Sequence, residues 1–300
     1  MLPEHRVIGV DLGGTKILTG IVTHDGTIDR RRETATPVDS EAALLAGLDE
    51  AVEELLGPEV VAIGFGVPSR LEHGTGRVQG SVNIPLEGID LRQRMEERFS
   101  LPVGVENDAN SAAYAEFRSG AGRDAETMVM LTLGTGCGGG VVIDRKLYRG
   151  WAEFGHMVIE YDGVPCQGTC TGRGHLEPYV TGVAATKLAQ EAFGPAVDSH
   201  RLVRLAAEGE RRAVEILDGI GRRLGAGIAS LVNIFDPDLV VIGGGFAAAG
   251  DFLLAPAREV MRRDTLAPDG GRVQIVRAEL GTAAGLIGAG LVAFDVADSA

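Results

Sequence analysis

A strand that runs into a glycine-rich turn and then into a second strand occurs twice in this chain. The first copy is Val10-Asp11-Leu12-Gly13-Gly14-Thr15-Lys16, followed by the apolar run 17–22, and the second is Leu131-Thr132-Leu133-Gly134-Thr135-Gly136-Cys137-Gly138-Gly139-Gly140, followed by 141–143. Because glycine lets backbone N–H groups approach one anion together, both turns are candidate phosphate cradles. Two hairpins without a ligand are the alternative, but a hairpin does not need so many glycines. The repeat predicts two related lobes that hold one phosphate chain.

Composition excludes several classes of protein. The chain has 300 residues, 45% of them hydrophobic and 23% charged, which is typical of a globular protein with one large or two ordinary domains. A formal charge of −14 disfavours nucleic acid and anionic membranes as partners. No run approaches the roughly 20 apolar residues of a membrane span, and no signal peptide is evident. With only three cysteines, we expect a reducing, cytoplasmic location and no disulfide framework.

The periodicity predicts strands and helices in both halves of the chain. Strands are expected from Val7 to about Thr36, at Val60–Val67, at Leu101–Val105, from Thr127 and at Leu239–Ile242. Helices are expected at Ser40–Leu56, at Leu91–Phe99 and at Asp108–Phe117, followed by a long helix that ends near Phe235, another that runs to about Arg263 and a last one at Gly281–Phe294. This order predicts a duplicated α/β fold. The expected lobes are residues 1–119 and 120–300, with a hinge near Gly120 to Gly122 and with the last helix free to pack on the first lobe.

Two familiar nucleotide motifs do not apply. Gly134 to Gly139 matches GxGxxG, but a strand follows it where a dinucleotide-binding fingerprint opens a helix. Lys16 lacks the spacing of a P-loop. Gly243-Gly244-Gly245 does lie between a predicted strand and a helix, where it could hold the adenosine end of a nucleotide or simply form a tight turn. Both interpretations of that turn stay open.

Two carboxylates stand where phosphate chemistry needs them. Asp11 ends the first buried strand beside a phosphate turn, so it could hold Mg²⁺ directly or through water, or be a structural turn residue. Asp108, in Val105-Glu106-Asn107-Asp108-Ala109-Asn110, lies at a junction of strand and helix. There it could accept a proton from a hydroxyl that attacks a γ-phosphate, or it could cap the helix.

A third group of residues suits a metal and a polyhydroxylated ligand. Glu153 and His156 lie three residues apart, and a loop of small and polar residues follows them. Two thiols and two imidazoles, from His156, Cys166, Cys170 and His175, suffice for a structural zinc site. Ordinary cysteines and a surface histidine are the alternative. A loop without a core of its own gains order from a metal, which favours the zinc interpretation.

These motifs together resemble the ROK family of sugar kinases, open reading frames and repressors, and within it the bacterial glucokinases. The resemblance covers nearly the whole chain and rests on six motifs in order: 11–16, 64–68, 106–110, 132–140, 153–157 and 237–245. It implies an actin-like ATPase fold of the hexokinase, ribonuclease H-like type, with ATP and Mg²⁺ in an interlobe cleft and phosphoryl transfer to a hexose hydroxyl. It also implies that Asp108 is the base. The implied sugar contacts are Gly66, Asn107, Asp108, Glu153, His156 and Glu177.

Two departures from the family pattern matter. The family zinc loop resembles C-x-C-G-x-x-G-C-x-E, whereas this chain has Cys166, Cys170 and then His175 in place of the last cysteine. Histidine is a competent zinc ligand, so a Cys2His2 site is expected, with Cys166 the least secure ligand. The second departure is Ser69, which follows Val67-Pro68 where the family usually has glycine. That change weakens any inference about which sugar binds.

The sequence therefore predicts an ATP-dependent hexose kinase, with glucokinase as the first expectation and a role in carbohydrate metabolism. Fructose, mannose or N-acetylmannosamine are alternative substrates, and ADP or polyphosphate are alternative donors. A non-catalytic sugar sensor is a weaker alternative. A DNA-binding repressor is weaker still, because Asp11 leaves no room before it for a DNA-binding segment in this sequence. A homodimer is expected from the resemblance, without nucleic acid or membrane partners.

Overall fold

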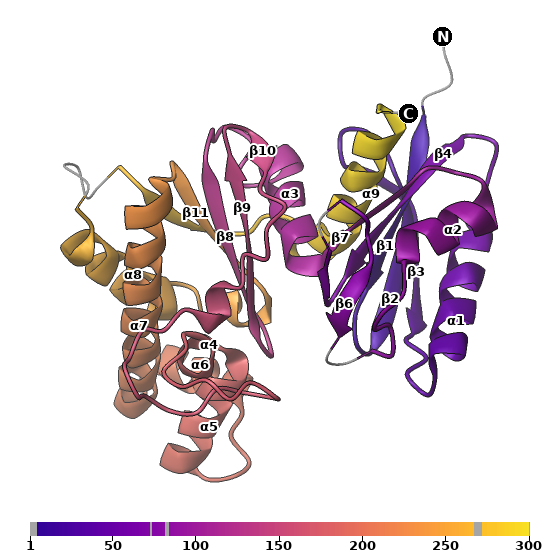
Figure 1. Ribbon diagram of the computed structural model, residues 1–300. Helices are drawn as coiled ribbons and strands as arrows, with labels where there is room; N and C mark the ends of the chain where they lie inside the picture. The colour runs from indigo at the N-terminus through magenta and orange to yellow at the C-terminus, as the bar shows by residue number, and fades with distance from the viewer. Residues whose placement is uncertain (1–4, 73, 82–83, 267–271, 300) are drawn as a thin grey trace. The chain divides into compact units, whose positions relative to one another are not determined.

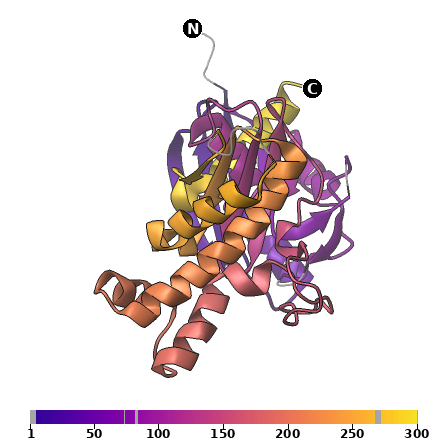
Figure 2. The same cartoon turned by 90° about the vertical axis from the view of Figure 1, so that its left-hand side faces the viewer.

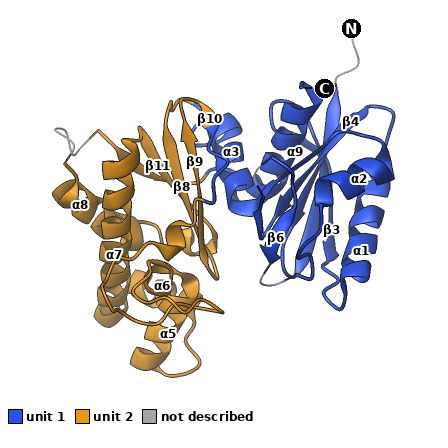
Figure 3. Ribbon diagram, in the orientation of Figure 1, with its two compact units in different colours: residues 1–123, 147–151, 279–300 blue, residues 124–146, 152–278 orange. Residues whose placement is uncertain are grey.

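The computed structural model describes residues 5–72, 74–81, 84–266 and 272–299. It divides into two compact units (Figure 3). Unit 1, in blue, comprises residues 1–123, 147–151 and 279–300, and unit 2, in orange, comprises 124–146 and 152–278. The chain thus returns to unit 1 twice, once through the short segment 147–151 and once through its last helix.

Unit 1 is built on a five-stranded mixed sheet with the order β3-β2-β1-β4-β7 (Figure 1). Its strands are β1 (Arg6–Leu12), β2 (Lys16–Val22), β3 (Ile28–Ala35), β4 (Val60–Val67) and β7 (Val103–Asn107). The first three form an antiparallel meander, while β4 and β7 lie parallel to β1. A separate hairpin pairs β5 (Ser69–Leu71) with β6 (Val78–Ser81).

Unit 2 repeats this topology, with the strand order β10-β9-β8-β11-β12. Its strands are β8 (Met128–Leu133), β9 (Cys137–Ile143), β10 (Lys146–Leu147), β11 (Leu239–Gly243) and β12 (Gln274–Arg277). β8 and β9 are antiparallel, and β11 and β12 run parallel to β8, as β4 and β7 do to β1. The duplication that the two glycine turns predict is confirmed at the level of strand order.

The helices of unit 1 cover both faces of its sheet. They are α1 (Glu41–Glu53), α2 (Leu91–Phe99), α3 (Asp108–Ser119), the short 3₁₀ turn η3 (Gly281–Ala283) and α9 (Ala284–Ala297). Residues alternate along each strand, so that Ile8, Val10 and Leu12 face the core shared with α1 and α2. The intervening residues face α9, which packs against both the sheet and α3.

A row of glycines explains how closely α9 approaches the sheet. A Cβ on Gly9, Gly64 or Gly104 would lie within 3.0 Å of the α9 backbone or the Val292 side chain, and at Gly64 it would collide with the Ala289 carbonyl oxygen. The register places Gly9 beside Gly64 and Gly64 beside Gly104. Three neighbouring strands therefore have glycine at adjacent positions across the sheet, and α9 occupies the space that side chains would fill there.

The helices of unit 2 share one apolar core with its sheet. They are η1 (Phe154–His156), α4 (Glu177–Val180), α5 (Gly182–Phe193), α6 (Ser199–Ala207), α7 (Arg211–Phe235), η2 (Gly245–Ala249) and α8 (Asp251–Asp264). The long helix α7 lies alongside α8 (Figures 1 and 2). Gly221 and Gly225 permit that contact, because a Cβ on either would meet an α8 carbonyl oxygen at 2.4 or 2.5 Å. Among the described residues, no helix is long and apolar enough to cross a membrane.

The structure also contains elements that the periodicity did not predict. The β5–β6 hairpin and β12 are strands of three or four residues, too short to show a clear alternation. The long helix predicted to end near Phe235 is α7, and three shorter helices that were not predicted, α4, α5 and α6, precede it. The turn Gly243–Gly245 leads into the 3₁₀ helix η2 before α8 begins.

Candidate active site

The predicted site residues fall into one group in each unit. Unit 1 holds Asp11, the turn 13–16, Gly66, Asn107 and Asp108. Unit 2 holds the turn 134–136, Glu153, the zinc-loop residues, Glu177 and Gly243 to Gly245. Each group includes residues at the ends of parallel strands, where the carboxyl edge of an open α/β sheet commonly binds ligands.

In unit 1, three neighbouring strands bring the candidate residues to one edge. Asp11 of β1 pairs with Gly66 of β4, and Gly66 pairs with Glu106 of β7, one residue before Asn107 and two before Asp108. Gly66 lies within β4 rather than in a turn. A Cβ there would meet the Ser111 Oγ at 3.2 Å, so the glycine lets the start of α3 lie against the strand.

The start of α3 separates two roles that the sequence left open. Asn107 is the N-cap, because its Oδ1 accepts hydrogen bonds from the N–H groups of Ala109 and Asn110 at 2.9 and 3.1 Å. Asp108 is the first residue of the helix, and its Oδ1 accepts a 2.9 Å hydrogen bond from the Ala109 N–H. Asn107 caps the helix, so Asp108 is not needed for that purpose.

Glu106 is a site residue that sequence reasoning did not single out. Its buried carboxylate accepts hydrogen bonds from the Asn107 N–H at 2.9 Å and the Asn110 Nδ2 at 3.0 Å, and it lies 3.9 Å from Arg149 Nε. Asn110 Nδ2 also donates to the Gly150 carbonyl at 3.2 Å. These contacts fasten the segment 147–151 to the start of α3. The signal was available in the motif itself, since Glu106 directly precedes Asn107 and Asp108 in the sequence.

Asp11 has the environment of a cation-binding carboxylate. Burial raises its pKa from 3.8 to about 6, and the charges of Lys16 and Arg31 counteract only part of that rise. Its carboxylate lies against α9, where a Cβ on Gly285 would fall 2.6 Å from Asp11 Cγ. No hydrogen bond to this carboxylate comes from the described part of the chain. A desolvated carboxylate without donors suits a divalent cation, whose charge would favour the ionised form.

The two glycine turns have related hydrogen-bonding patterns. In the first, the Gly13 N–H donates to the Lys16 carbonyl at 2.9 Å, and Thr36 Oγ1 donates to the Gly13 carbonyl at 2.7 Å. In the second, the Gly134 N–H donates to the Gly136 carbonyl at 2.9 Å. The N–H groups of Gly14 and Thr15 in the first turn, like those of Thr135 and Gly136 in the second, have no acceptor among the described residues. Each turn therefore keeps two adjacent donors for an anion.

A cavity of about 650 Å³ lies beside the second turn, entirely within unit 2. Gly134 and Thr135 line it, and so does Gly245 of the predicted adenosine-side turn. Gly243 and Gly244 support the turn instead: Gly244 has φ of +80°, and a Cβ on Gly243 would meet the Met130 side chain at 2.6 Å. The other lining residues, which the sequence reasoning missed, include the apolar Val183, Val203, Phe246, Ala248 and Ala249 and the basic Lys187, His200 and Arg204. Apolar walls with basic groups suit a nucleotide.

Glu153 and Glu177 approach the base of the second turn. Glu177 Oε2 accepts a 2.8 Å hydrogen bond from the Cys137 N–H. Burial, with smaller contributions from the charges of Glu177 and Glu153, raises the pKa of the Cys137 thiol to about 12. That thiol is therefore protonated at neutral pH and is not a nucleophile. Both carboxylates that the sequence predicts for sugar binding therefore lie near Cys137.

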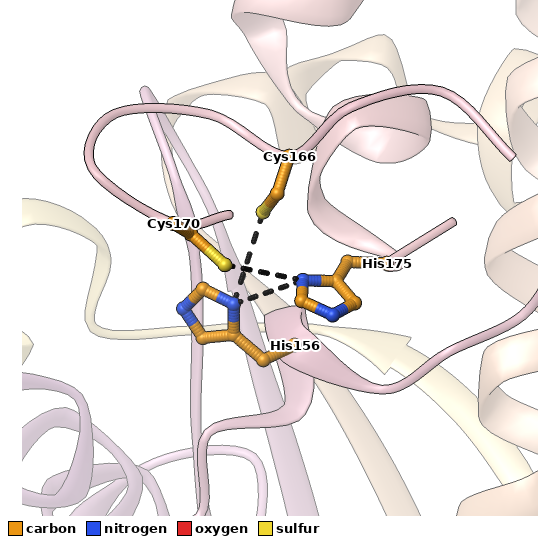
Figure 4. Close-up of side chains that lie close together, drawn as sticks. All are labelled: His156, Cys166, Cys170 and His175. Carbon is orange, nitrogen blue, oxygen red and sulfur yellow. Dashed lines mark hydrogen bonds between the residues drawn. The ribbon is translucent and has the colours of Figure 1, made fainter. Parts of the chain in front are cut away.

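The four predicted zinc ligands also come together (Figure 4). The ligand atoms of His156, Cys166, Cys170 and His175 all lie within 4.8 Å of one another. The two imidazole Nδ1 atoms are 3.2 Å apart, Cys166 Sγ lies 3.8 Å from Nδ1 of His156, and Cys170 Sγ lies 3.7 Å from Nδ1 of His175. In a tetrahedral zinc site, these separations would be about 3.3 Å for two nitrogens and about 3.6 Å for nitrogen and sulfur. The donor set therefore fits zinc.

Comparisons with known sequences indicate the family of this chain. The model of the ROK family matches residues 7–296. A glucokinase of Streptomyces coelicolor is 35% identical over 94% of this chain and 95% of its own length. An N-acetylmannosamine kinase of Vibrio vulnificus is 32% identical over 83% of this chain and 85% of its own length.

Solved structures lead to the same family. A ROK glucokinase from Streptomyces griseus, in complex with glucose and AMPPNP, has a TM-score of 0.82 and 34% identity, with 97% of this chain and 99% of that chain covered. A ROK hexokinase from Thermus thermophilus has a TM-score of 0.85 and 34% identity, with 98% and 100% covered. The chain therefore belongs to the ROK family and has the actin-like, hexokinase-type fold of its members.

Proposed function

We propose that this protein is an ATP-dependent hexose kinase that transfers the γ-phosphoryl group to the 6-hydroxyl of glucose. The observation that carries the proposal is the register of unit 1, which holds Asp11 and the start of α3 at one edge of three parallel strands. Phosphoryl transfer needs a group that fixes the cation and a group that receives the hydroxyl proton. Asp11 suits the first task and Asp108 the second.

Asp108 is the proposed general base. The hydroxyl proton passes to its carboxylate as the hydroxyl oxygen attacks the γ-phosphorus and the bond to the leaving ADP oxygen breaks. Because Asn107 caps α3, it holds the first turn of the helix, and therefore the backbone of Asp108, in a fixed conformation. The Asn107 Nδ2 group, which lies 3.4 Å from the Ser69 carbonyl, is a donor for a sugar hydroxyl. The remaining sugar contacts proposed are Gly66, Glu153, His156 and Glu177.

The glycine turns and the cavity are proposed to hold ATP. The N–H groups of Gly14, Thr15, Thr135 and Gly136, for which the described residues provide no acceptor, would donate to phosphate oxygens. The cavity walls at Phe246 and Val203 would take the adenine, with Gly245 beside it. Mg²⁺, held at Asp11 when bound, would neutralise charge on the phosphates. An apolar cavity next to the turn supports a nucleotide donor over polyphosphate, which has no base to bury.

A structural zinc is proposed at His156, Cys166, Cys170 and His175. Both histidines turn Nδ1 toward the cluster, which leaves Nε2 of His156 available to a sugar hydroxyl. Burial raises the pKa of the Cys166 thiol to about 11, so that zinc binding must release a proton there. The bound metal would hold the loop that leads to Glu177 in one conformation.

Glucose is the first substrate to test, because glucokinases are among the relatives with the highest identity. A kinase for another hexose is the second candidate, since similarity extends to an N-acetylmannosamine kinase and Ser69 departs from the family pattern near the sugar contacts.

The test is ADP release by the purified protein with MgATP and each of glucose, mannose, fructose, N-acetylglucosamine and N-acetylmannosamine, with a blank lacking sugar. Release that depends on sugar and favours glucose supports the proposal. Preference for another sugar keeps the kinase and changes its substrate. The absence of release with every sugar, in zinc-replete protein, contradicts the proposed activity and favours a non-catalytic sugar sensor.

A further inference from the structure

Glu177 makes a contact that its proposed sugar-binding role does not require. Its Oε2 accepts the hydrogen bond from the Cys137 N–H at the base of the second glycine turn. Cys137 pairs with Leu133 as the first residue of β9, so this N–H is not one of the donors at the tip of the turn. The carboxylate therefore holds the turn at Cys137, the first residue after it, and the N–H groups of Thr135 and Gly136 stay available to a phosphate.

The same contact gives a reason for the glycine at position 136. Gly136 does not have a positive φ, so its backbone conformation does not demand glycine. A Cβ at this position would lie 2.8 Å from Glu177 Oε2, closer than side chains tolerate. By contrast, a Cβ on Gly134 in the same turn would meet nothing within 4 Å. Gly136 thus makes room for the Glu177 carboxylate.

The segment that carries Glu177 holds the turn at a second point and is itself tied to the zinc loop. The Gly182 N–H donates to the Gly134 carbonyl at 3.0 Å. The hydroxyl of Tyr179 accepts a 2.9 Å hydrogen bond from the Val164 N–H, and Gln167 Nε2 donates to Thr181 Oγ1 at 3.2 Å. Residues 177–182 therefore connect the loop of the zinc ligands to the phosphate turn through hydrogen bonds within unit 2.

We infer that Glu177 couples acceptor and donor binding: one carboxylate oxygen holds the phosphate turn at Cys137, and the other binds the sugar. This inference rests on the proposed function, which supplies the sugar at Glu177 and the phosphate at the turn. Sugar binding fixes the carboxylate, and the fixed carboxylate holds the turn in its phosphate-binding conformation. By thermodynamic reciprocity, nucleotide binding must tighten sugar binding by the same factor.

The test uses the phosphate turn to perturb sugar binding in the absence of nucleotide. Calorimetry with glucose, or with the sugar that releases most ADP, gives Kd for the zinc-replete wild type, for Gly136→Ala and for Gly134→Ala as the matched control. Gly136→Ala displaces the carboxylate and should raise Kd about 10-fold, in the usual range of such couplings. Gly134→Ala should change it less than about 2-fold. Equal effects of the two variants would overturn the inference.

Two further variants separate the possible failures. In a Glu177→Ala background, Gly136→Ala should have no additional effect on sugar Kd, because the carboxylate it displaces is gone. Glu177→Asp, which keeps the charge but is one methylene shorter, should weaken AMPPNP binding measured without sugar by about 5-fold or more. An unchanged AMPPNP Kd in that variant would overturn the inference even if Gly136→Ala did not fold. A wild type that binds none of the sugars would instead refute the proposed function.

Discussion

The partly buried carboxylate of Asp11 should contribute less to the stability of the ligand-free protein at neutral pH than in acid. Its pKa rises from 3.8 to about 6 on folding, because burial disfavours the ionised form. A raised carboxyl pKa favours folding fully below pH 3.8, and this contribution is lost as the pH rises through about 6. With about 1.4 kcal/mol for each pKa unit, the cost of the ionised carboxylate is about 0.5 kcal/mol at pH 4 and at most about 3 kcal/mol at pH 8.

Asp11→Asn removes this cost while keeping the shape of the side chain. We expect the variant to be more stable than the wild type by about 1 to 3 kcal/mol at pH 8 and by less than about 0.5 kcal/mol at pH 4. Urea unfolding at both pH values measures the difference. The single tryptophan, Trp151, belongs to unit 1 and so reports on the same unit as Asp11.

Asp25→Asn is the matched control for Asp11→Asn. Hydrogen bonds from Thr23 and Thr27 lower the pKa of Asp25, so its ionised form favours folding and the substitution should not stabilise unit 1 at pH 8. The reasoning about Asp11 would be refuted by an Asp11→Asn variant whose stability relative to the wild type does not change between pH 4 and pH 8.

Two other predictions concern the metal loop and the glycine row. Chelation of zinc, or Cys170→Ser, should weaken glucose binding about 10-fold or more and AMPPNP binding by a smaller factor, because the loop before Glu177 loses its order. Metal analysis together with calorimetry tests this prediction. An unchanged glucose Kd in metal-free protein would contradict it. Gly64→Ala should destabilise unit 1 by about 3 kcal/mol or more, because its Cβ collides with the Ala289 carbonyl oxygen. Gly219→Ala is the control: its Cβ has room on α7, so this variant should be as stable as the wild type or more stable by up to about 1 kcal/mol. Urea unfolding measures both variants, and equal stabilities would refute the packing argument.

The duplicated topology could be predicted because its cause is local. Each copy begins with an apolar strand, a glycine turn and a second strand, and this pattern lies within residues 6–22 in the first copy and 128–143 in the second. The clustering of His156, Cys166, Cys170 and His175 was predictable for the same reason, since three of them lie in one short loop and His156 precedes it closely. Residue type and spacing are sufficient where the partners are close in sequence.

Other features depend on the register of distant strands and could not be predicted. Gly9, Gly64 and Gly104 form one row only because β1, β4 and β7 pair at those positions, and nothing near each glycine in sequence indicates α9. The contact of Glu177 with the Cys137 N–H likewise joins residues that are 40 positions apart. The assignment of the N-cap to Asn107 rather than Asp108 required the backbone conformation of both residues.

Asp108 is the proposed base of a sugar kinase. The most direct test of this role is the turnover of Asp108→Asn with MgATP and saturating glucose, measured together with the glucose Kd from calorimetry. Asparagine keeps the size of the side chain but cannot take up the hydroxyl proton. We expect a fall in kcat of about 10² to 10⁴-fold, with a glucose Kd within several-fold of that of the wild type. A variant that binds glucose and turns over at the wild-type rate would show that Asp108 is not the base.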